Sequence, residues 1–430
     1  MPLAETPAPR TPNNADWRII TFTKPLLWNR SDKETWYFLP GRRYILNANQ
    51  LEFVKNHIDR MSDLHSGANY NPLRVGTNLA NTRILVERCR ERGIGDLLFM
   101  TGPLNYLRHV SGHTCHIEFF TLADRSPVLE HHPALPFDTP LLGPTDYDHL
   151  PHYHYHWFVS AVTEYDEERD QLNVYDALYK QMGADPGTID PQFKRPSMHL
   201  VEQDFQDLDT LYFFIYRLKQ LDLRRTPYYV VAPLAHGSLR MAEFNRWLEI
   251  ISELSRARPV CVIGHVQDQR IPSADMPYGS FVRQLDRLAA KAPIINLLGS
   301  TPLRVVAALI KNAVCAVTLD SGPLYLAQAL RTPAVSLWGP VNPMARIGYD
   351  RDYMDLAIWE RGACPHAACF AYSKFPISRC PAGAGTVVCE CLRHVATQAV
   401  IERVKFVEES RRVVTLGTID TQSPATQVAT

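Results

Sequence analysis

The chain has 430 residues, of which 46% are apolar and 21% are charged, so it is long enough for two domains with sizeable cores. Its 45 basic and 45 acidic residues cancel, which argues against bulk binding to nucleic acid or to an anionic membrane. No run approaches the about eighteen apolar residues of a membrane span, and the first residues lack the basic-then-apolar order of a signal peptide. We expect a cytoplasmic globular protein.

The N-terminal part differs in character from the rest of the chain. Residues 1–16 are rich in Pro and Asn, and we expect them to be disordered. The next stretch, 17–72, predicts short strands at 18–28, 35–40 and 42–46 and then a helix at 51–61. We interpret 17–72 as a small β-rich extension.

A first series of strands and helices follows in residues 73–225. The sequence predicts a buried strand at 83–90, a turn, a helix from about Asp96, a second strand at 116–122 and a closing helix at 208–221. Between them, 125–200 predicts loops with a weak helix near 172–182. His149, His152, His154 and His156 alternate as in a strand within this stretch, and acceptor binding, loop packing and metal binding are the alternatives for them.

A second series occupies residues 226–410. Strands are predicted at 228–234, 259–265, 295–299, 315–320 and 334–340, and helices of ten to fifteen residues separate them. This alternation predicts parallel βαβ units, so the fold class is α/β. Ligands of such sheets bind beyond the carboxyl ends of the strands. A last helix at 395–412 leads into a flexible tail, 411–430.

The strongest local signal is the turn in CAVTLDSGPLYLAQALR. Ser321 and Gly322 stand between a strand and a helix, where backbone N–H groups and the positive end of the helix dipole suit a phosphate. Gly322 allows close approach because it has no Cβ. The alternative is structural, with Asp320 as an N-cap and Gly322 as a turn residue.

The turn RGIGD in the first half follows the same logic. Gly93 and Gly95 open a strand-to-helix turn, and Asp96 stands where an N-cap would stand. A plain helix cap is therefore the alternative to a functional carboxylate here as well.

The two turns together resemble the heptosyltransferase family of glycosyltransferases (family 9), whose fold is GT-B. The resemblance rests on ILVERCRERGIGD in the first half and on VTLDSGPLYLAQALRTPAVSLWGP in the second. It implies two Rossmann-like domains that face a central cleft, an acceptor domain at 73–225 and a nucleotide-sugar donor domain at 226–410. It implies an inverting transferase that needs no metal ion for catalysis, with an ADP-heptose-like donor.

The resemblance also assigns roles to individual residues. Asp96 matches the carboxylate that acts as general base on the acceptor hydroxyl. Ser321 and Gly322, after Asp320, match the turn that contacts the donor phosphates. Arg240 stands seven residues before Trp247, where the family has a phosphate-binding Lys, and its charge would serve the same purpose.

Two further donor-site positions match less well. Asp268 follows the strand at 259–265, at the approximate place of an acidic residue that accepts ribose hydroxyls. Tyr325 stands where the family commonly has a His, and it can donate a hydrogen bond but carries no positive charge near pH 7. This departure puts the identity of the donor in doubt.

Five of the nine cysteines crowd into 364–391: Cys364, Cys369, Cys380, Cys389 and Cys391. Their spacing is not the paired Cys-x-x-Cys of a zinc ribbon. The family often has a Cys-rich loop here, and some bacterial autotransporter heptosyltransferases, which this chain resembles, bind iron there through four cysteines. A structural Zn or Fe site and a set of unligated thiols are the two alternatives.

The sequence thus favours a glycosyltransferase that binds a nucleotide-sugar and modifies a glycan, a protein or a nucleic-acid base. A homo-oligomer is compatible with it. The alternative from another class is a non-catalytic nucleotide-sugar-binding or scaffold protein that keeps the GT-B fold, and the departure at Tyr325 is the feature that favours it.

Overall fold

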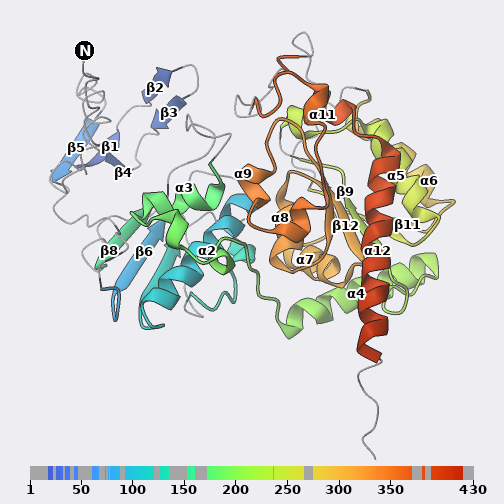
Figure 1. The fold of residues 1–430 in the computed structure, drawn as a ribbon, viewed down its shortest axis with the longest axis horizontal. Coiled ribbons are helices and arrows are strands. Elements are labelled where there is room, and N and C mark those ends of the chain that lie inside the picture. Colours follow the sequence, from blue (N-terminus) through green and yellow to red (C-terminus); the bar gives the residue numbers. More distant parts are fainter. Residues whose placement is uncertain are drawn as a thin grey trace, which may run out of the picture.

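The computed structural model of the chain describes residues 18–22, 26–31, 34–38, 43–46, 61–66, 73, 76, 78–87, 93–120, 126–135, 153–159, 172–235, 237–265, 275–369, 380–382 and 389–419. Two α/β halves lie side by side, and the N-terminal strands form the outer end of the first half (Figure 1). The predicted disordered segment and residues 51–60 of the helix predicted at 51–61 lie outside the described residues, and Met61 belongs to strand β5 (Met61–Ser66) and not to a helix.

The N-terminal extension is built from short antiparallel strands. Strands β1 (Arg18–Phe22), β4 (Arg43–Leu46) and β5 (Met61–Ser66) form a sheet in the order β4-β1-β5. Strands β2 (Leu26–Ser31) and β3 (Glu34–Phe38) form a hairpin with Trp28 opposite Trp36. The predicted strand at 18–28 is therefore two strands that belong to different sheets.

The first half holds a small parallel sheet in the order β7-β6-β8. Its strands are β6 (Arg83–Glu87), β7 (His116–Phe120) and β8 (Tyr155–Phe158), and helix α2 (Ile94–Val110) connects β6 to β7. The alternating His/Tyr segment ends in β8, where His156 is buried and His154 is exposed. His149 and His152 lie outside the described residues.

The second half holds a larger parallel sheet in the order β11-β10-β9-β12-β13-β14. Its strands are β9 (Tyr229–Ala232), β10 (Val260–Val262), β11 (Ile294–Asn296), β12 (Cys315–Leu319), β13 (Ala334–Leu337) and β14 (Ala357–Ile358). Because helices cover both faces, strands β9, β10, β12 and β13 are buried at every residue. The sequence predicted all of these strands except β14.

Five longer helices surround this sheet within the described residues. They are α5 (Phe244–Ser255), α6 (Tyr278–Ala289), α7 (Leu303–Asn312), α8 (Gly322–Ala329) and α12 (Thr397–Ile419). Two short helices, α9 (Met344–Ile347) and α10 (Arg351–Met354), separate β13 from β14. Another short helix, α11 (Glu390–Arg393), precedes α12. No helix within the described ranges has the length and apolar character needed to cross a membrane.

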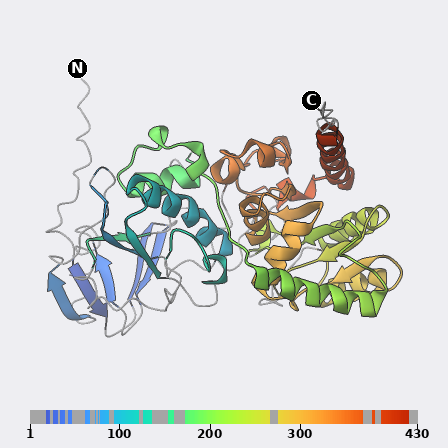
Figure 2. The ribbon, with the colours of Figure 1, turned by 90° about the horizontal axis from the view of Figure 1, so that it is seen from below.

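Helix α4 (Glu202–Lys219) precedes β9 in the chain and runs along the second half (Figure 2). Its buried side chains Leu208, Tyr212 and Ile215 face that half, and Tyr212 shares a hydrogen bond of 2.7 Å with Tyr228 at the start of the second series. The Arg304 guanidinium, on α7, binds both carboxylate oxygens of Asp204 at 2.6 and 2.7 Å. The domain boundary at 225/226 stays a prediction, but the helix before it packs against the second half.

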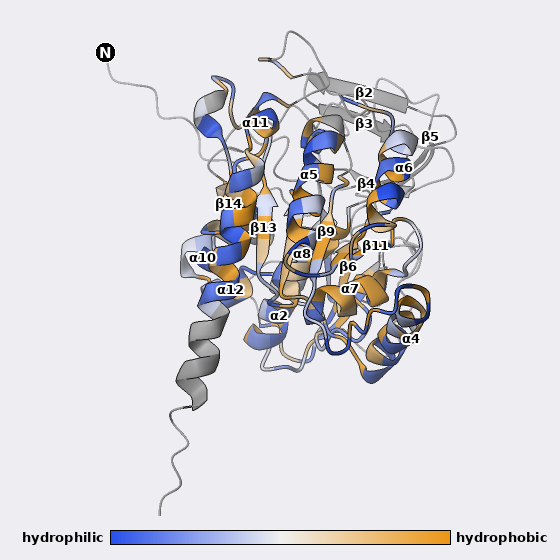
Figure 3. Ribbon diagram, turned by 90° about the vertical axis from the view of Figure 1, so that its right-hand side faces the viewer, coloured by the Kyte–Doolittle hydropathy of each residue, from blue (hydrophilic) through white to orange (hydrophobic). Residues whose placement is uncertain are grey.

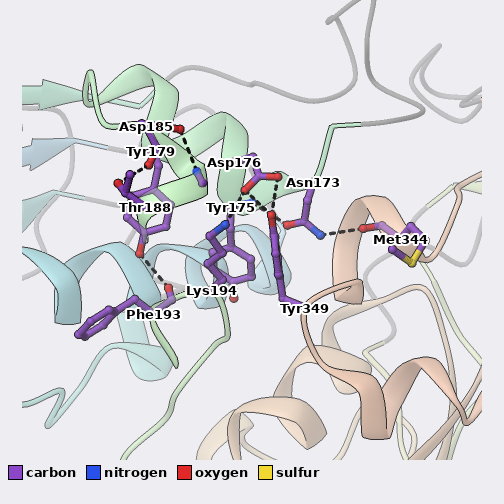
Figure 4. Close-up of polar contacts among 11 residues, drawn as sticks. Asn173, Tyr175, Asp176, Tyr179, Asp185, Thr188, Phe193, Lys194, Met344 and Tyr349 are labelled. Carbon is purple, nitrogen blue, oxygen red and sulfur yellow. Dashed lines mark hydrogen bonds and ion pairs between the residues drawn. The ribbon is translucent and has the colours of Figure 1, made fainter. Parts of the chain in front are cut away.

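The first half contacts the second through helix α3 (Val174–Gln181), which the sequence predicted at 172–182. The Asn173 side chain donates to the Met344 carbonyl at 2.7 Å, and the Tyr349 hydroxyl donates to the Asp176 carboxylate at 2.7 Å (Figure 4). The buried Lys194 ammonium lies 3.1 Å from Asp176 and 4.0 Å from the centre of the Tyr349 ring. These contacts hold the segment that carries α9 against the first half.

Candidate functional site

The two glycine turns singled out in the sequence meet where helices α2 and α8 begin. A Cβ on Gly95 would lie 2.5 Å from Cδ2 of Tyr325, and one on Gly322 would lie 3.3 Å from the Cβ of Ile94. Only glycine at position 95 therefore lets the start of α2 reach the Tyr325 ring. Because both helices present their N-terminal ends here, their dipoles add a positive potential to the same region.

Asp96 lies in the first turn of α2 and is half-buried. The helix begins at Ile94 with Gly93 as its N-cap, so Asp96 is the third helical residue and not the N-cap that the sequence suggested. A Cβ on Gly93 would overlap the Asp96 carboxylate, which shows that this side chain folds back over the start of its own helix. Because Gly93 has no Cβ, the Asp96 carboxylate can occupy this position.

Asp320 follows β12 and is 3% exposed. The Tyr325 hydroxyl donates a hydrogen bond to its carboxylate. Arg240, at the end of a short 3-10 helix (Ser238–Arg240), donates to the Asp320 carbonyl at 3.3 Å, and its guanidinium lies 3.9 Å from the Asp320 carboxylate. The Arg240 guanidinium is therefore held beside the turn that precedes α8. A side chain that binds a phosphate at this turn would need such a position.

Ser321 is the N-cap of α8, the role that the structural alternative gave to Asp320. Its backbone is extended (φ −157°, ψ 171°), and its hydroxyl donates to the Leu319 carbonyl at 3.4 Å instead of capping the helix. Pro323 supplies no N–H to this first turn. The N–H groups at the Ser321–Gly322 turn are therefore the donors that the start of α8 can direct at an anion.

Tyr325 is almost completely buried and stays a neutral hydrogen-bond donor. Burial, and after it the Asp320 carboxylate, raise the pKa of this phenol well above its usual value, while the charges of Arg346 and Arg240 oppose the shift. The ring also contacts Phe99 of α2 edge-on, with 4.6 Å between centroids, and Phe99 contacts Tyr175 of α3. This aromatic row joins the two halves next to the site.

Arg346 is the residue of this site that sequence reasoning missed. It lies on α9, is 5% exposed, and its charge acts on Tyr325. A buried arginine is rare unless it is paired or has a function. The signal in the sequence was a single positive charge in the apolar run after WGPVNP, which carries no recognisable pattern.

Asp268, the expected ribose acceptor, lies outside the described residues. A hollow of about 330 Å³ lies away from the site, between the end of α4 and residues 289–295. Residues 289–293 precede β11 and 294–295 begin it, so the hollow lies at the amino edge of the parallel sheet, whereas Asp320 and Arg240 follow strands at its carboxyl edge. We therefore assign the donor site to the carboxyl edge and not to this hollow.

The cysteines of the loop 364–391 come together in part. Four of them are buried, namely Cys364, Cys380, Cys389 and Cys391, whereas Cys369 is half-buried. The Cys391 side chain hydrogen-bonds with those of Cys389 and Cys364; the contact with Cys389, followed by burial, raises the pKa of Cys391. A Cβ on Gly339, after β13, would lie 3.0 Å from the Cys389 sulfur and 2.9 Å from the Leu239 carbonyl.

The Cys389 thiol therefore lies close to Gly339 at the end of β13, where the Leu239 carbonyl also approaches. Buried, mutually contacting thiols are the donor set that a structural zinc or iron ion requires. Within the part of the chain that the structure describes, however, no three side chains of His, Cys, Asp or Glu come close enough together to hold a metal ion.

Comparisons with known proteins find similarity to a glycosyltransferase family and to solved structures of that fold. Residues 183–372 match the model of glycosyltransferase family 9 (heptosyltransferase). Lipooligosaccharide heptosyltransferase 2 of Haemophilus influenzae is 36% identical over 69 residues, which are 16% of this chain and 20% of that relative. The chain therefore matches about one fifth of the length of this curated relative.

Two solved structures share the fold at low sequence identity. The ADP-heptose LPS heptosyltransferase II of E. coli has a TM-score of 0.52 at 15% identity and covers 77% of this chain and 99% of its own. TibC of enterotoxigenic E. coli, described as an iron-containing dodecameric glycosyltransferase, has a TM-score of 0.52 at 16% identity over 92% of each chain. The fold is therefore the predicted GT-B fold of the glycosyltransferases.

The predicted resemblance to glycosyltransferase family 9 is likewise confirmed. The matched range contains Arg240, Asp320 and the Ser321–Gly322 turn, whereas the turn with Asp96 lies before it.

Proposed function

We propose that this chain is an inverting glycosyltransferase that moves a heptose from an ADP-heptose-like donor to an acceptor hydroxyl on a glycan, a protein or a modified base, without a catalytic metal ion. The observation that carries the proposal is the contact between the starts of α2 and α8. It puts the turn with Asp96 next to the turn with Ser321 and Gly322, although more than two hundred residues of sequence separate them.

In this proposal Asp96 is the general base. A sugar hydroxyl is a poor nucleophile at neutral pH, and a carboxylate within hydrogen-bond reach takes its proton as oxygen bonds to the anomeric carbon. The nucleoside diphosphate leaves from the opposite face, so the anomeric configuration inverts. The dipole of α8, Arg240 and Arg346 would stabilise the charge of the leaving diphosphate, and Asp268 would accept the ribose hydroxyls.

An ADP-heptose-like donor is supported by the neighbours and by the site. TibC has been solved in complex with ADP-D-β-D-heptose and has a TM-score of 0.52 to this chain. Two arginines and the α8 N-terminus supply positive charge for a diphosphate here. Tyr325 adds none, because its phenol is neutral and its hydroxyl is engaged by Asp320.

One observation favours the alternative of a non-catalytic nucleotide-sugar-binding protein. The Asp320 carboxylate accepts from Tyr325 within a core position that is 3% exposed, so this pair stabilises the turn without any ligand. Such a protein would bind the donor and transfer nothing, which makes donor binding and turnover the two quantities to measure separately.

The substitution Asp96→Asn tests the proposal, because it keeps the shape of the side chain and removes proton acceptance. We expect transfer from ADP-heptose to fall by about 10²–10⁴, as general-base removal usually costs, while calorimetry finds donor affinity nearly unchanged. Asp352→Asn, an exposed change on α10, is the matched control and should leave both quantities unchanged. Near-wild-type turnover of Asp96→Asn would leave this residue with only a structural role in the first turn of α2.

We also propose that the buried cysteines hold one structural zinc or iron ion, which would require them to approach one another more closely than they do among the described residues. The four buried thiols, the contacts of Cys391 and the iron-containing description of TibC support it. Such an ion would fix the loop against Gly339 and would take no part in the transfer step. A cytoplasmic location and a homo-oligomeric assembly complete the proposal, the latter supported by the dodecameric description of TibC.

A further inference from the structure

Helix α4 exposes an unusual number of large apolar side chains. Phe213, Phe214, Tyr216 and Leu218 are exposed by 50%, 56%, 45% and 82%, although the opposite face of the same helix packs against the second half. Eight large apolar side chains are exposed among the described residues, and these four fall within six positions. Figure 3 shows the helix at the edge of the molecule, with hydrophobic and hydrophilic residues mixed along it.

The area involved is large for a surface that faces only water. Buried aromatic side chains remove roughly 150–250 Å² each from solvent, so four side chains that are about half exposed or more present on the order of 400 Å². Patches of about 300–600 Å² are the largest on a typical monomer and are often functional. A stable interface takes about 800 Å² from each partner. Because successive residues are about 100° apart around a helix, Phe214 and Tyr216 do not share one face, so the part of this area on a single face supplies less than half of such an interface.

Helix α4 has acidic residues in its N-terminal half and basic residues in its last turn. The exposed acidic residues Glu202, Asp207 and Asp209 lie in its N-terminal half, whereas Arg217 and Lys219 lie in its last turn. The Arg217 guanidinium lies 6.0 Å from the centre of the Phe213 ring, so it stands at the edge of the apolar patch. A helix with an acidic half and a basic half is complementary to a second copy of itself in the antiparallel direction.

The spacing of the exposed residues fixes a register for such a pair. Positions 203, 207, 210, 214 and 217 alternate by four and three residues, which is the spacing of one stripe along a helix that pairs with another helix. All five are exposed: Gln203, Asp207, Thr210, Phe214 and Arg217. If two antiparallel copies are related by a two-fold axis at the height of residue 212, Asp207 of one faces Arg217 of the other, and Phe214 packs on Thr210.

We propose that the outer face of α4 is a self-association surface, at which two copies of this chain pair antiparallel through Phe214 and the Asp207–Arg217 contacts. A two-fold axis makes each contact twice, so a single stripe supplies two charge pairs and two aromatic anchors. No other protein is needed to explain the patch, because the complementary charges already lie on the same helix. The inference is independent of the transferase activity.

Sedimentation velocity of the full chain over a wide range of concentration tests this surface. We expect the wild type to associate, and Phe214→Ser to raise the dissociation constant at least about tenfold, as loss of a central anchor does. The matched control is Phe406→Ser on α12, which removes an equally exposed phenylalanine (56%) away from the surface and should change nothing. Thermal unfolding checks that each variant remains folded.

Charge reversal tests the register itself. Asp207→Arg and Arg217→Asp should each weaken association by about tenfold, because two attractive pairs become repulsive. The double variant restores opposite charges at both contacts and should return the dissociation constant to near the wild-type value. A wild type that stays monomeric, α4 variants that associate like Phe406→Ser, or a double variant no tighter than the single ones would each overturn the proposal.

Discussion

The contact between Gly95 and Tyr325 can be tested by adding one methyl group. Gly95→Ala would put a carbon 2.5 Å and 2.9 Å from two ring atoms of Tyr325, whereas carbon atoms pack best at about 3.5–4.0 Å. The ring cannot simply move aside, because its hydroxyl is bound to Asp320 and its edge rests on Phe99. Either the ring loses that hydrogen bond or the start of α2 moves away from α8.

The expected loss of stability follows from three contributions. Overpacking costs about 1–3 kcal/mol, and a weakened hydrogen bond to a charged group costs about 1.5–3 kcal/mol more. Alanine recovers up to about 1 kcal/mol because it forms helix better than glycine. We therefore expect the free energy of unfolding to fall by about 1.5–6 kcal/mol. With an unfolding entropy of about 0.9 kcal/mol/K for a chain of this length, Tm should fall by roughly 2–7 °C.

Differential scanning calorimetry measures this change, and Gly279→Ala supplies the control. Gly279 is also the second residue of its helix, α6, but a Cβ there would meet only Arg283, at 3.6 Å. This variant should be as stable as the wild type or slightly more stable. If Gly95→Ala and Gly279→Ala unfold at the same temperature, the starts of α2 and α8 do not touch, and the site built on their contact is wrong.

Three further predictions concern other parts of the chain. Arg240→Ala should weaken nucleoside diphosphate binding about tenfold to a hundredfold in calorimetric titration, with partial recovery in Arg240→Lys, and unchanged affinity would move the phosphate site elsewhere. Elemental analysis of protein purified without chelator should find about one zinc or iron per chain, whereas metal-free protein with freely titrating thiols would refute the structural ion. Burial, and after it the charge of His199, lowers the pKa of His132 to about 3. Below about pH 6.5 the His132 imidazole is therefore protonated in the unfolded chain but stays neutral in the folded chain. Stability should fall by about 2 kcal/mol between pH 6.5 and 5 for this reason, and urea unfolding of His132→Asn should lack that part of the loss; an identical acid dependence would contradict it.

The sequence predicted the second sheet well because each of its strands is an apolar run between amphipathic helices. Strand β14 was not predicted because it has only two residues, Ala357 and Ile358, and is defined by its pairing with Ser336 and Leu337. Helix α4 was predicted, but not its packing. Its apolar residues occur on several sides, and the sequence cannot say which of them meet α7.

Parts of the candidate site could also be predicted from the sequence, and other parts could not. The turns with Gly95 and Gly322 could be found because glycine before a helix is a visible local pattern, whereas their contact with each other depends on the packing of two halves. Arg346 could not be found, since its importance lies in being buried beside Tyr325 and not in its neighbours along the chain. Helix α2 begins at Ile94, so Asp96 lies in the first turn and not at the predicted N-cap. Errors of about this size are usual for helix boundaries predicted from sequence.

The packing of α4 also sets an order of events during synthesis. Asp204 leaves the ribosome 100 residues before Arg304, which is its partner on α7. At a synthesis rate of about 5–20 residues per second, roughly 5–20 s pass before Arg304 is made. During that time Leu208, Tyr212 and Ile215 of α4 are not yet covered by the second half. The nascent chain is therefore most exposed to aggregation while residues 220–304 are being made, and chaperone binding in that interval would concentrate on α4.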